Sequence, residues 1–244
     1  RGAVARPLAL FSLGLALGIA PATLHNWLQD GTLVPVCTTG GITFYLGNHA
    51  GNPTGRYASP PFATATADSE ERDFIAEAAR RTGRPLRPAE ASSFWFRQAL
   101  AEMAADPGPA ARRIGRRIRW AVADEEGTDS RTFEFYRERH RVLRAAPWGF
   151  GFVSLLGLIG LGTALRRTLA FPAALAALLV GGLALFLVYG RYRLPLLVPL
   201  SLLAAAGLAR LWAWARERRA LALALAGLAA AVLAWVVYAP AAPG

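Results

Sequence analysis

Long apolar blocks alternate with polar connections along this chain, and the blocks are too long for the interior of a soluble domain. Five of them are roughly 18 to 21 residues long, which is the length that an α-helix needs to cross a bilayer. They cover residues 7–24, 148–165, 169–189, 194–211 and 220–238. The pattern predicts a mainly α-helical membrane protein with about five transmembrane helices and one large extracytoplasmic insertion, mixed or helical in structure, after the first.

The expected division is a transmembrane helix at residues 1–26, a loop domain at 27–147 and a four-helix transmembrane region at 148–244. Residues 1–24 also fit a secretory signal, because a basic start and an apolar run precede the small residues after Ile19. The run is longer than the usual ~7 to 15 residues of a signal, which favours a retained helix. Because the chain begins with Arg1, we expect it to be part of a longer protein.

The short connections predict the orientation. If five helices simply alternate, the connections that carry most arginine fall on one side, which the positive-inside rule makes the cytoplasm. These arginines are Arg1, Arg6, Arg166, Arg167, Arg210, Arg216, Arg218 and Arg219. The large insertion, the short turn near residue 191 and the C-terminus then lie outside the cytoplasm.

Within the insertion, capping residues and charge patterns predict three helices. Ser69 as N-cap, acids in the first turn and Gly83 as a stop predict the first, which ends at Thr82. The second covers 93–105 and the third about 109–122. The third carries Arg112, Arg113, Arg116, Arg117 and Arg119 against Ile114, Ile118 and Trp120. Such a helix indicates either contact with anionic lipid at the membrane interface or a solvated arginine face packed on the domain.

A turn-rich stretch at residues 38–55 opens the insertion. Its glycines permit positive φ and close backbone approach, while its uncharged polar side chains suit sugars or headgroups. The candidate contacts are Tyr45, Gly47, Asn48 and Asn52. The alternative is an ordered surface turn.

Other chemistry receives less support. Asp124 and Glu125 open an acidic cluster with Glu126 and Asp129, which suits either acid–base catalysis or a solvated charge run. Histidines His25, His49 and His140 show no metal-ligand spacing, so we expect no metal site. Cys37 is the one cysteine, so no intramolecular disulfide forms. The spans contain no ionisable residue in their interiors, which argues against an ion-coupled carrier.

Two arginines, Arg191 and Arg193, lie beside Tyr189 in the short turn between the third and fourth spans. A short loop on the outer side should lack positive charge. Guanidinium groups bind phosphate through paired, charge-assisted hydrogen bonds, so we expect the turn to hold a lipid phosphate. The alternative is that both arginines anchor the helix ends at lipid headgroups.

Three segments carry a resemblance to a known family. They are the run GGITFYLGN at 40–48 preceded by PATLHNW at 21–27, the run WGFGF at 148–152, and RYRLP at 191–195 followed by Pro199. In this order they resemble segments of bacterial polytopic glycosyltransferases similar to the dolichyl-phosphate-mannose protein mannosyltransferase family. These are GT-C class enzymes, which move a sugar from a polyprenyl-phosphate donor to an acceptor at the extracytoplasmic face.

The resemblance implies a multi-pass protein of the bacterial cytoplasmic (inner) membrane, whose partners are membrane lipids and the lipid-linked sugar donor, with no nucleic acid. Arg191, Arg193 and Tyr189 would hold the donor phosphate, and Tyr45 with its neighbours would contact the sugar or acceptor. The catalytic acid is expected upstream, in the N-terminal half of the same protein, so this chain alone would be inactive. The alternative is a non-catalytic membrane protein whose outer domain binds a lipid or protein partner.

Overall fold

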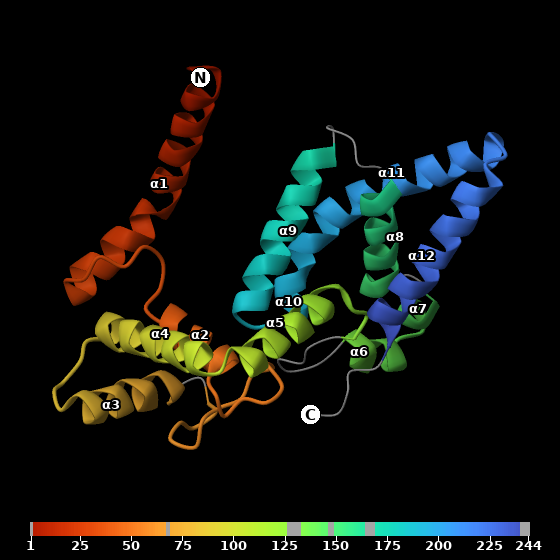
Figure 1. The fold of residues 1–244 in the computed structure, drawn as a ribbon. Coiled ribbons are helices and arrows are strands. Elements are labelled where there is room, and N and C mark those ends of the chain that lie inside the picture. Colours follow the sequence, from red (N-terminus) through yellow and green to blue (C-terminus); the bar gives the residue numbers. More distant parts are fainter. Residues whose placement is uncertain (1, 67–68, 126–132, 146–148, 164–168, 240–244) are drawn as a thin grey trace. The chain divides into compact units, whose positions relative to one another are not determined.

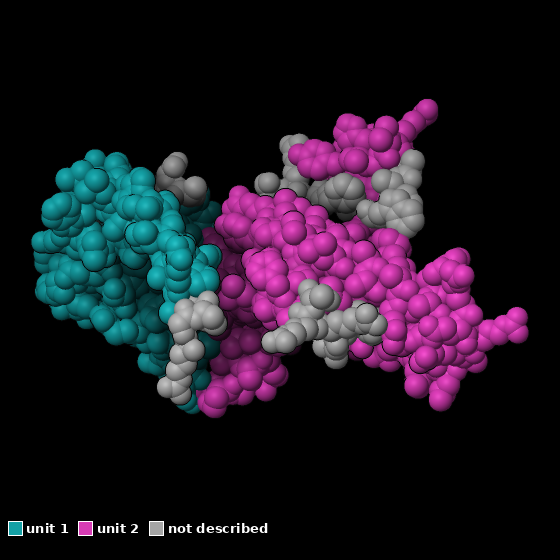
Figure 2. Space-filling view, turned by 90° about the horizontal axis from the view of Figure 1, so that it is seen from above, with its two compact units in different colours: residues 1–51, 58–105 teal, residues 52–57, 106–244 magenta. Residues whose placement is uncertain are grey.

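The computed structural model describes residues 2–66, 69–125, 133–145, 149–163 and 169–239 (Figure 1). All regular secondary structure within these ranges is helical. The helical form of the insertion is therefore confirmed for its described part, and the mixed form is not found there. The chain forms two compact units, residues 1–51 with 58–105 (unit 1) and residues 52–57 with 106–244 (unit 2), which Figure 2 colours separately.

Three helical segments are long and apolar enough to cross a membrane, by length and composition. The first lies in α1 (Gly2–Asp30), the second covers 190–216 and the third is α12 (Ala220–Tyr238). Two more apolar helices, α8 (Phe150–Thr163) and α9 (Ala170–Leu185), are shorter. Residues 146–148 and 164–168, with Trp148, Arg166 and Arg167, lie outside the described part. The prediction is thus confirmed to the extent that the described chain is helical and has three helical segments that could cross a membrane.

Unit 1 holds α1, α2 (Gly40–Asn48), α3 (Glu70–Thr82) and α4 (Pro88–Ala105). The indole of Trp95 is fully buried between the helices, and its Nε1 donates to the Phe74 carbonyl at 2.9 Å. Tyr45, Phe62 and Phe74 pack around this ring, with centroids 4.6 to 5.1 Å from it. This aromatic cluster is the core on which α2, α3 and α4 assemble.

Helix α2 corrects the expectation of a turn for residues 40–48, whereas the turn-rich part after it is observed at 50–56. Gly41 near its start serves helix packing: a Cβ there would lie 1.9 Å from the Ser92 carbonyl oxygen, and the Gly41 N–H donates to Ser92 Oγ at 2.9 Å. Burial of Phe44, Tyr45 and Leu46 against α4 favours the helix over a loop. Tertiary packing therefore outweighs the turn propensity of glycine here.

The predicted helices of the insertion are observed. Helix α3 ends at Thr82 with Gly83 in the left-handed region (φ 70°), as expected of a glycine C-cap. Helix α4 begins earlier than predicted, at Pro88, where proline suits the first helical position. The Glu90 carboxylate there accepts a hydrogen bond from the Arg87 N–H at 2.9 Å, the backbone half of a capping box.

Unit 2 contains the remaining helices: α5 (Pro107–Val122), α6 (Phe133–Arg139), α7 (Arg141–Ala145), α8, α9, α10 (Gly190–Arg193), η2 (Leu194–Leu196), α11 (Leu197–Arg216) and α12. Helix α8 packs closely on α11 through glycine. A Cβ on Gly160 would lie 1.9 Å from the Leu203 carbonyl oxygen, and one on Gly157 would lie 2.8 Å from Leu200 Cδ2. Glycine thus permits the two backbones to approach, as small residues do between membrane helices.

Candidate functional site

Helix α5 is amphipathic and basic, and part of its basic face is buried. Arg117 is fully buried, and its Nη1 donates at 2.9 Å to the carbonyl of Phe186, which follows the last residue of α9. Burial, with the nearby charge of Arg113, lowers the pKa of Arg117 to about 10, so the side chain remains a cation at neutral pH. Carbonyls at a helix C-terminus lack intrahelical donors and carry partial negative charge, which Arg117 satisfies here.

The same contact recurs at a second helix. Arg119 Nε donates to the Val236 carbonyl at 3.1 Å, and its Nη2 donates to the carbonyl of Ala239, the residue after α12. The backbone N–H of Asp124 donates to the Val237 carbonyl at 2.9 Å. Helix α5 therefore lies across the C-terminal ends of both α9 and α12 (Figure 1).

Arg193 is buried, with 3% of its surface exposed, and it binds the C-terminal end of α5 itself. Its Nη1 donates to the carbonyls of Trp120 at 3.0 Å and Ala123 at 2.5 Å, and its guanidinium lies 4.4 Å from the Phe150 ring centroid. The segment that was predicted to be a turn is the short helix α10. Arg193 thus has a structural position beneath the candidate phosphate site.

Arg191 is exposed, unlike Arg193. Its guanidinium lies 5.0 Å from the Tyr192 ring centroid and 6.0 Å from that of Tyr189, and Nη2 donates to the Tyr192 hydroxyl at 3.3 Å. Residues two apart on a helix point in nearly opposite directions, which separates the two arginines. The structure therefore presents one arginine on the surface, beside two tyrosines, instead of a pair.

The two acidic candidates, Asp124 and Glu125, both form polar contacts within unit 2. Asp124 Oδ1 accepts a hydrogen bond from the Gly151 N–H at 2.8 Å in the first turn of α8. Glu125 forms an ion pair with Arg56, whose guanidinium lies 4.7 Å from the Trp120 ring centroid. Glu126 and Asp129 lie outside the described residues. Helix capping and an ion pair account for the positions of both described carboxylates.

The candidate sugar contacts fall in both units. Tyr45, Gly47 and Asn48 lie buried on α2 in unit 1, and Asn52 lies buried in unit 2. Asn48 Nδ2 donates to the Phe44 carbonyl at 2.9 Å. Asn52 Oδ1 accepts from the backbone N–H of Gly55 at 2.8 Å, which stabilises a turn where Gly55 has φ 82°. These amides thus contribute to the packing of their own units.

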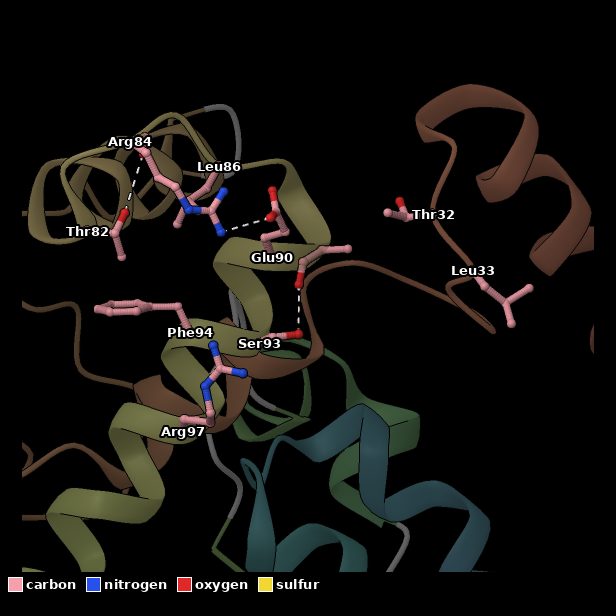
Figure 3. Close-up of a pocket in the computed structure, with 10 residues that line it drawn as sticks. Thr32, Leu33, Thr82, Arg84, Leu86, Glu90, Ser93, Phe94 and Arg97 are labelled. Carbon is pink, nitrogen blue, oxygen red and sulfur yellow. Dashed lines mark hydrogen bonds and ion pairs between the residues drawn. The ribbon is translucent and has the colours of Figure 1, made fainter.

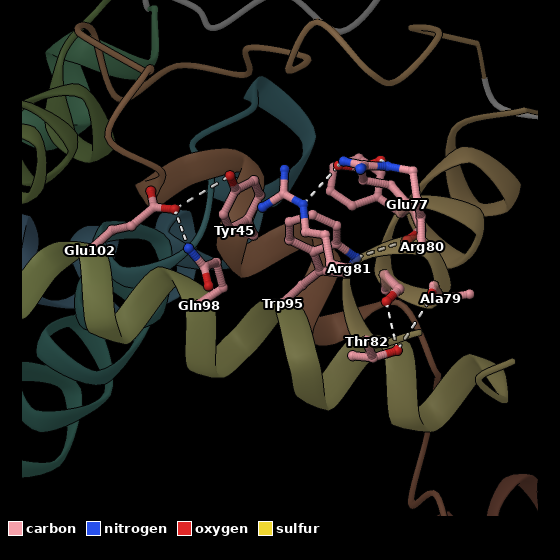
Figure 4. A network of polar contacts seen from close by, with 11 residues as sticks. Tyr45, Glu77, Ala79, Arg80, Arg81, Thr82, Trp95, Gln98 and Glu102 are labelled. Carbon is pink, nitrogen blue, oxygen red and sulfur yellow. Dashed lines mark hydrogen bonds and ion pairs between the residues drawn. The ribbon is translucent and has the colours of Figure 1, made fainter. Parts of the chain in front are cut away.

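Tyr45 belongs to a polar network on unit 1 (Figure 4). Its hydroxyl lies 3.5 Å from Glu102 Oε1, which also accepts from Gln98 Nε2 at 2.9 Å, while Oε2 accepts from the Ala50 N–H at 2.7 Å. Burial, with the negative charge of Glu102, raises the pKa of the Tyr45 phenol to about 12. The phenol is therefore a neutral donor at physiological pH.

A groove of about 470 Å³ lies in unit 1 (Figure 3). The residues that line it include Thr32, Arg84, Glu90, Ser93, Phe94 and Arg97. They come from the loop after α1, the α3–α4 connection and α4. This groove was not predicted from the sequence, because none of these segments carries a recognisable motif.

The buried arginines of α5 were also missed, although their spacing offered a signal. Ala110, Arg113, Arg117 and Ala121 follow one another at intervals of three or four residues, and all are buried. That interval marks one helix face, so the arginines share the face of the apolar residues. Among the described residues, no group of three or more His, Cys, Asp or Glu could hold a metal ion.

No family model, no curated protein and no solved structure matches this chain. The family resemblance therefore remains a hypothesis that rests on the sequence motifs.

Proposed function

We propose that this chain is the C-terminal part of an integral membrane glycosyltransferase that moves a sugar from a polyprenyl-phosphate donor to an acceptor at the extracytoplasmic face. The proposal rests on the family resemblance. It is supported by one observation, the exposed Arg191 guanidinium beside Tyr189 and Tyr192 at the end of an apolar helical segment. A cation at that position can bind a lipid phosphate.

The proposed topology has five membrane-spanning helices, with α8 and α9 as the short ones. Four helix ends contact α5 or the residue Asp124 shortly after it, and these contacts support the topology. The start of α8 binds Asp124, and the end of α9 binds Arg117. The start of 190–216 contacts α5 through Arg193, and the end of α12 binds Arg119. Helices α8 and 190–216 begin on the side where α5 lies, and α9 and α12 end there, so consecutive helices run antiparallel. Helix α5 then lies along the outer interface, where its exposed Ile118 and arginines meet lipid.

Cysteine labelling tests this topology in intact cells. Cys37 is exposed and should react with an impermeant maleimide. In a Cys37→Ser background, Glu217→Cys on the α11–α12 connection should be protected until the membrane is permeabilised. Ready labelling of Glu217→Cys in intact cells would reverse the orientation.

In the proposed mechanism, Arg191 holds the donor phosphate by charge-assisted hydrogen bonds. Asp124 and Glu125 are occupied by a helix N-terminus and by Arg56, so the catalytic carboxylate is assigned to the upstream half of the protein. Tyr189 and Tyr192 position the guanidinium by their rings. The isolated chain of 244 residues is accordingly inactive in sugar transfer.

Sugar transfer by membranes that carry the full reading frame tests the transferase role. Arg191→Ala should raise the apparent KM for a polyprenyl-phosphate sugar about tenfold or more, as expected when a hydrogen bond to a charged group is lost. Arg191→Lys should restore it in part, because an ammonium lacks the planar fork. Arg216→Ala, at the exposed last residue of α11, is the control. An unchanged KM in Arg191→Ala would refute the phosphate role.

A second candidate is a non-catalytic membrane protein that binds a lipid or protein partner. The burial of Tyr45, Asn48 and Asn52 favours it, because these side chains are engaged within their own units. This function needs no upstream half. Full-length protein that inserts and folds but transfers no sugar from any polyprenyl-phosphate donor would favour it over the transferase.

A further inference from the structure

The groove of unit 1 is not used by the proposed function. Its volume of about 470 Å³ falls within the ~300 to 1,000 Å³ of small-molecule sites. A second hollow, of about 350 Å³, shares Ser93 and Arg97 with it. The two hollows therefore adjoin at α4, where Ser93 and Arg97 line both.

The charge in this groove is unbalanced. Arg84 Nη2 pairs with Glu90 Oε1 at 3.0 Å, and the other Glu90 oxygen accepts the Arg87 N–H. Arg97 has no hydrogen bond, ion pair or ring contact with any residue that the structure describes. One guanidinium is thus available to an anion in the groove.

Thr32 contributes a second polar group to the lining of the groove. Thr32 Oγ1 is enclosed, and no described residue hydrogen-bonds to it. Thr32 lies on the loop after α1, across the groove from Glu90 and Ser93 on α4 (Figure 3). Because most buried hydroxyls have a partner, an enclosed hydroxyl without one indicates a site for a hydrogen-bonding ligand.

We propose that this groove binds a ligand that carries a phosphate group, with Arg97 as its counter-cation, Thr32 Oγ1 as a hydrogen-bond donor and Phe94 in contact with its apolar part. A tetrahedral phosphate offers acceptor oxygens in several directions, so it can accept from both walls. Leu86 and Phe94 add apolar surface to the same groove. This site is independent of the transferase proposal, because Arg97 and Arg191 belong to different units.

Calorimetric titration of the purified chain in a maltoside detergent, which contains no phosphate, tests the site. The two probes are inorganic phosphate and dihexanoyl-phosphatidylglycerol below its micellar concentration. Arg97→Ala should weaken binding about tenfold or more, and Thr32→Val about fivefold, the effects of losing a charged and a neutral hydrogen bond. Arg216→Ala should bind as the parent chain does.

The two probes identify the source of the phosphate. Binding of both, each sensitive to Arg97→Ala, indicates recognition of the phosphate group itself. Binding of phosphatidylglycerol alone indicates a lipid headgroup, and binding of inorganic phosphate alone indicates a free anion. Binding of neither, or equal affinities in Arg97→Ala and Arg216→Ala, would overturn the proposal. Arg97 is exposed, so Arg97→Ala should leave the fold intact. Arg97→Lys and Thr32→Val change the side chains less and allow the same titration to be repeated with more conservative variants.

Discussion

The guanidinium of Arg193 donates a hydrogen bond from Nη1 to the Trp120 carbonyl at 3.0 Å, which joins the start of one apolar helical segment to the end of α5. The residues are distant in sequence, and the contact is largely shielded from water. Arg193 therefore stabilises unit 2, whereas Arg191 lies exposed beside Tyr189 and Tyr192. The two arginines of one sequence motif have separate roles.

Arg193→Ala should destabilise the chain by roughly 1.5 to 3 kcal/mol, because it removes hydrogen bonds between a charged donor and buried carbonyls. Arg191→Ala should leave stability within about 0.5 kcal/mol, as expected at an exposed site. Thermal unfolding of both variants in detergent, followed by circular dichroism, measures the difference. Equal midpoints would show that Arg193 has no structural role.

Asp124→Ala should destabilise unit 2 by about 0.5 to 2 kcal/mol, the usual cost of losing a side-chain cap at a helix N-terminus. Asp124→Asn should retain most of the stability, since the amide oxygen can accept the same Gly151 N–H. Glu125→Gln is the matched control, because its partly exposed pair with Arg56 contributes only about 0 to 1 kcal/mol. Chemical denaturation of the three variants ranks their losses of stability. A loss of stability in Glu125→Gln alone would contradict the prediction.

Gly160→Ala should destabilise the contact of α8 with α11 by about 1 to 3 kcal/mol, the usual cost of overpacking. The added Cβ would lie 1.9 Å from the backbone oxygen of Leu203, and a helix backbone cannot yield without moving the whole element. Gly181→Ala on α9 is the control, since no described atom lies within 4 Å of its Cβ position. Heat-induced aggregation midpoints in detergent compare them, and a neutral Gly160→Ala would mean that the helices pack less closely.

Acid should weaken unit 1 through Glu77 on α3. Hydrogen bonds from Arg80, then Arg81, lower the pKa of Glu77 from 4.5 to about 2. A depressed pKa in the folded state contributes stability that is fully present above about pH 4.5 and is lost as the pH falls towards 2. Glu77→Gln should lower the unfolding midpoint at pH 7 and flatten its decline between pH 4.5 and 2.5.

Glu138→Gln, at an exposed carboxylate on α6, provides the comparison for Glu77. Its unfolding profile should follow that of the parent chain across the same pH range. If Glu77→Gln declined as steeply as the parent, the arginine contacts of Glu77 would contribute nothing to stability.

Local features of the sequence determined the class of this protein and several of its elements. Apolar length identifies helices that can cross a membrane, because the bilayer requires a fixed span and internally satisfied backbone groups. Gly83 ends α3 because a glycine C-cap acts on its own helix terminus, and Ser69 occupies the N-cap position without a side-chain capping hydrogen bond. Such signals need no distant partner, so they can be read without the fold.

Only the tertiary structure decided the roles of glycine, arginine and aspartate. Gly41 permits a helix crossing, Arg193 binds the end of α5, and Asp124 caps α8; each depends on a partner far away in the sequence. The groove of unit 1 likewise brings together Thr32 and Arg97, which belong to different segments of the chain. The conformational propensity of a residue depends on its neighbours in sequence. Its contact partners depend on how the helices pack, so they are known only from the folded structure.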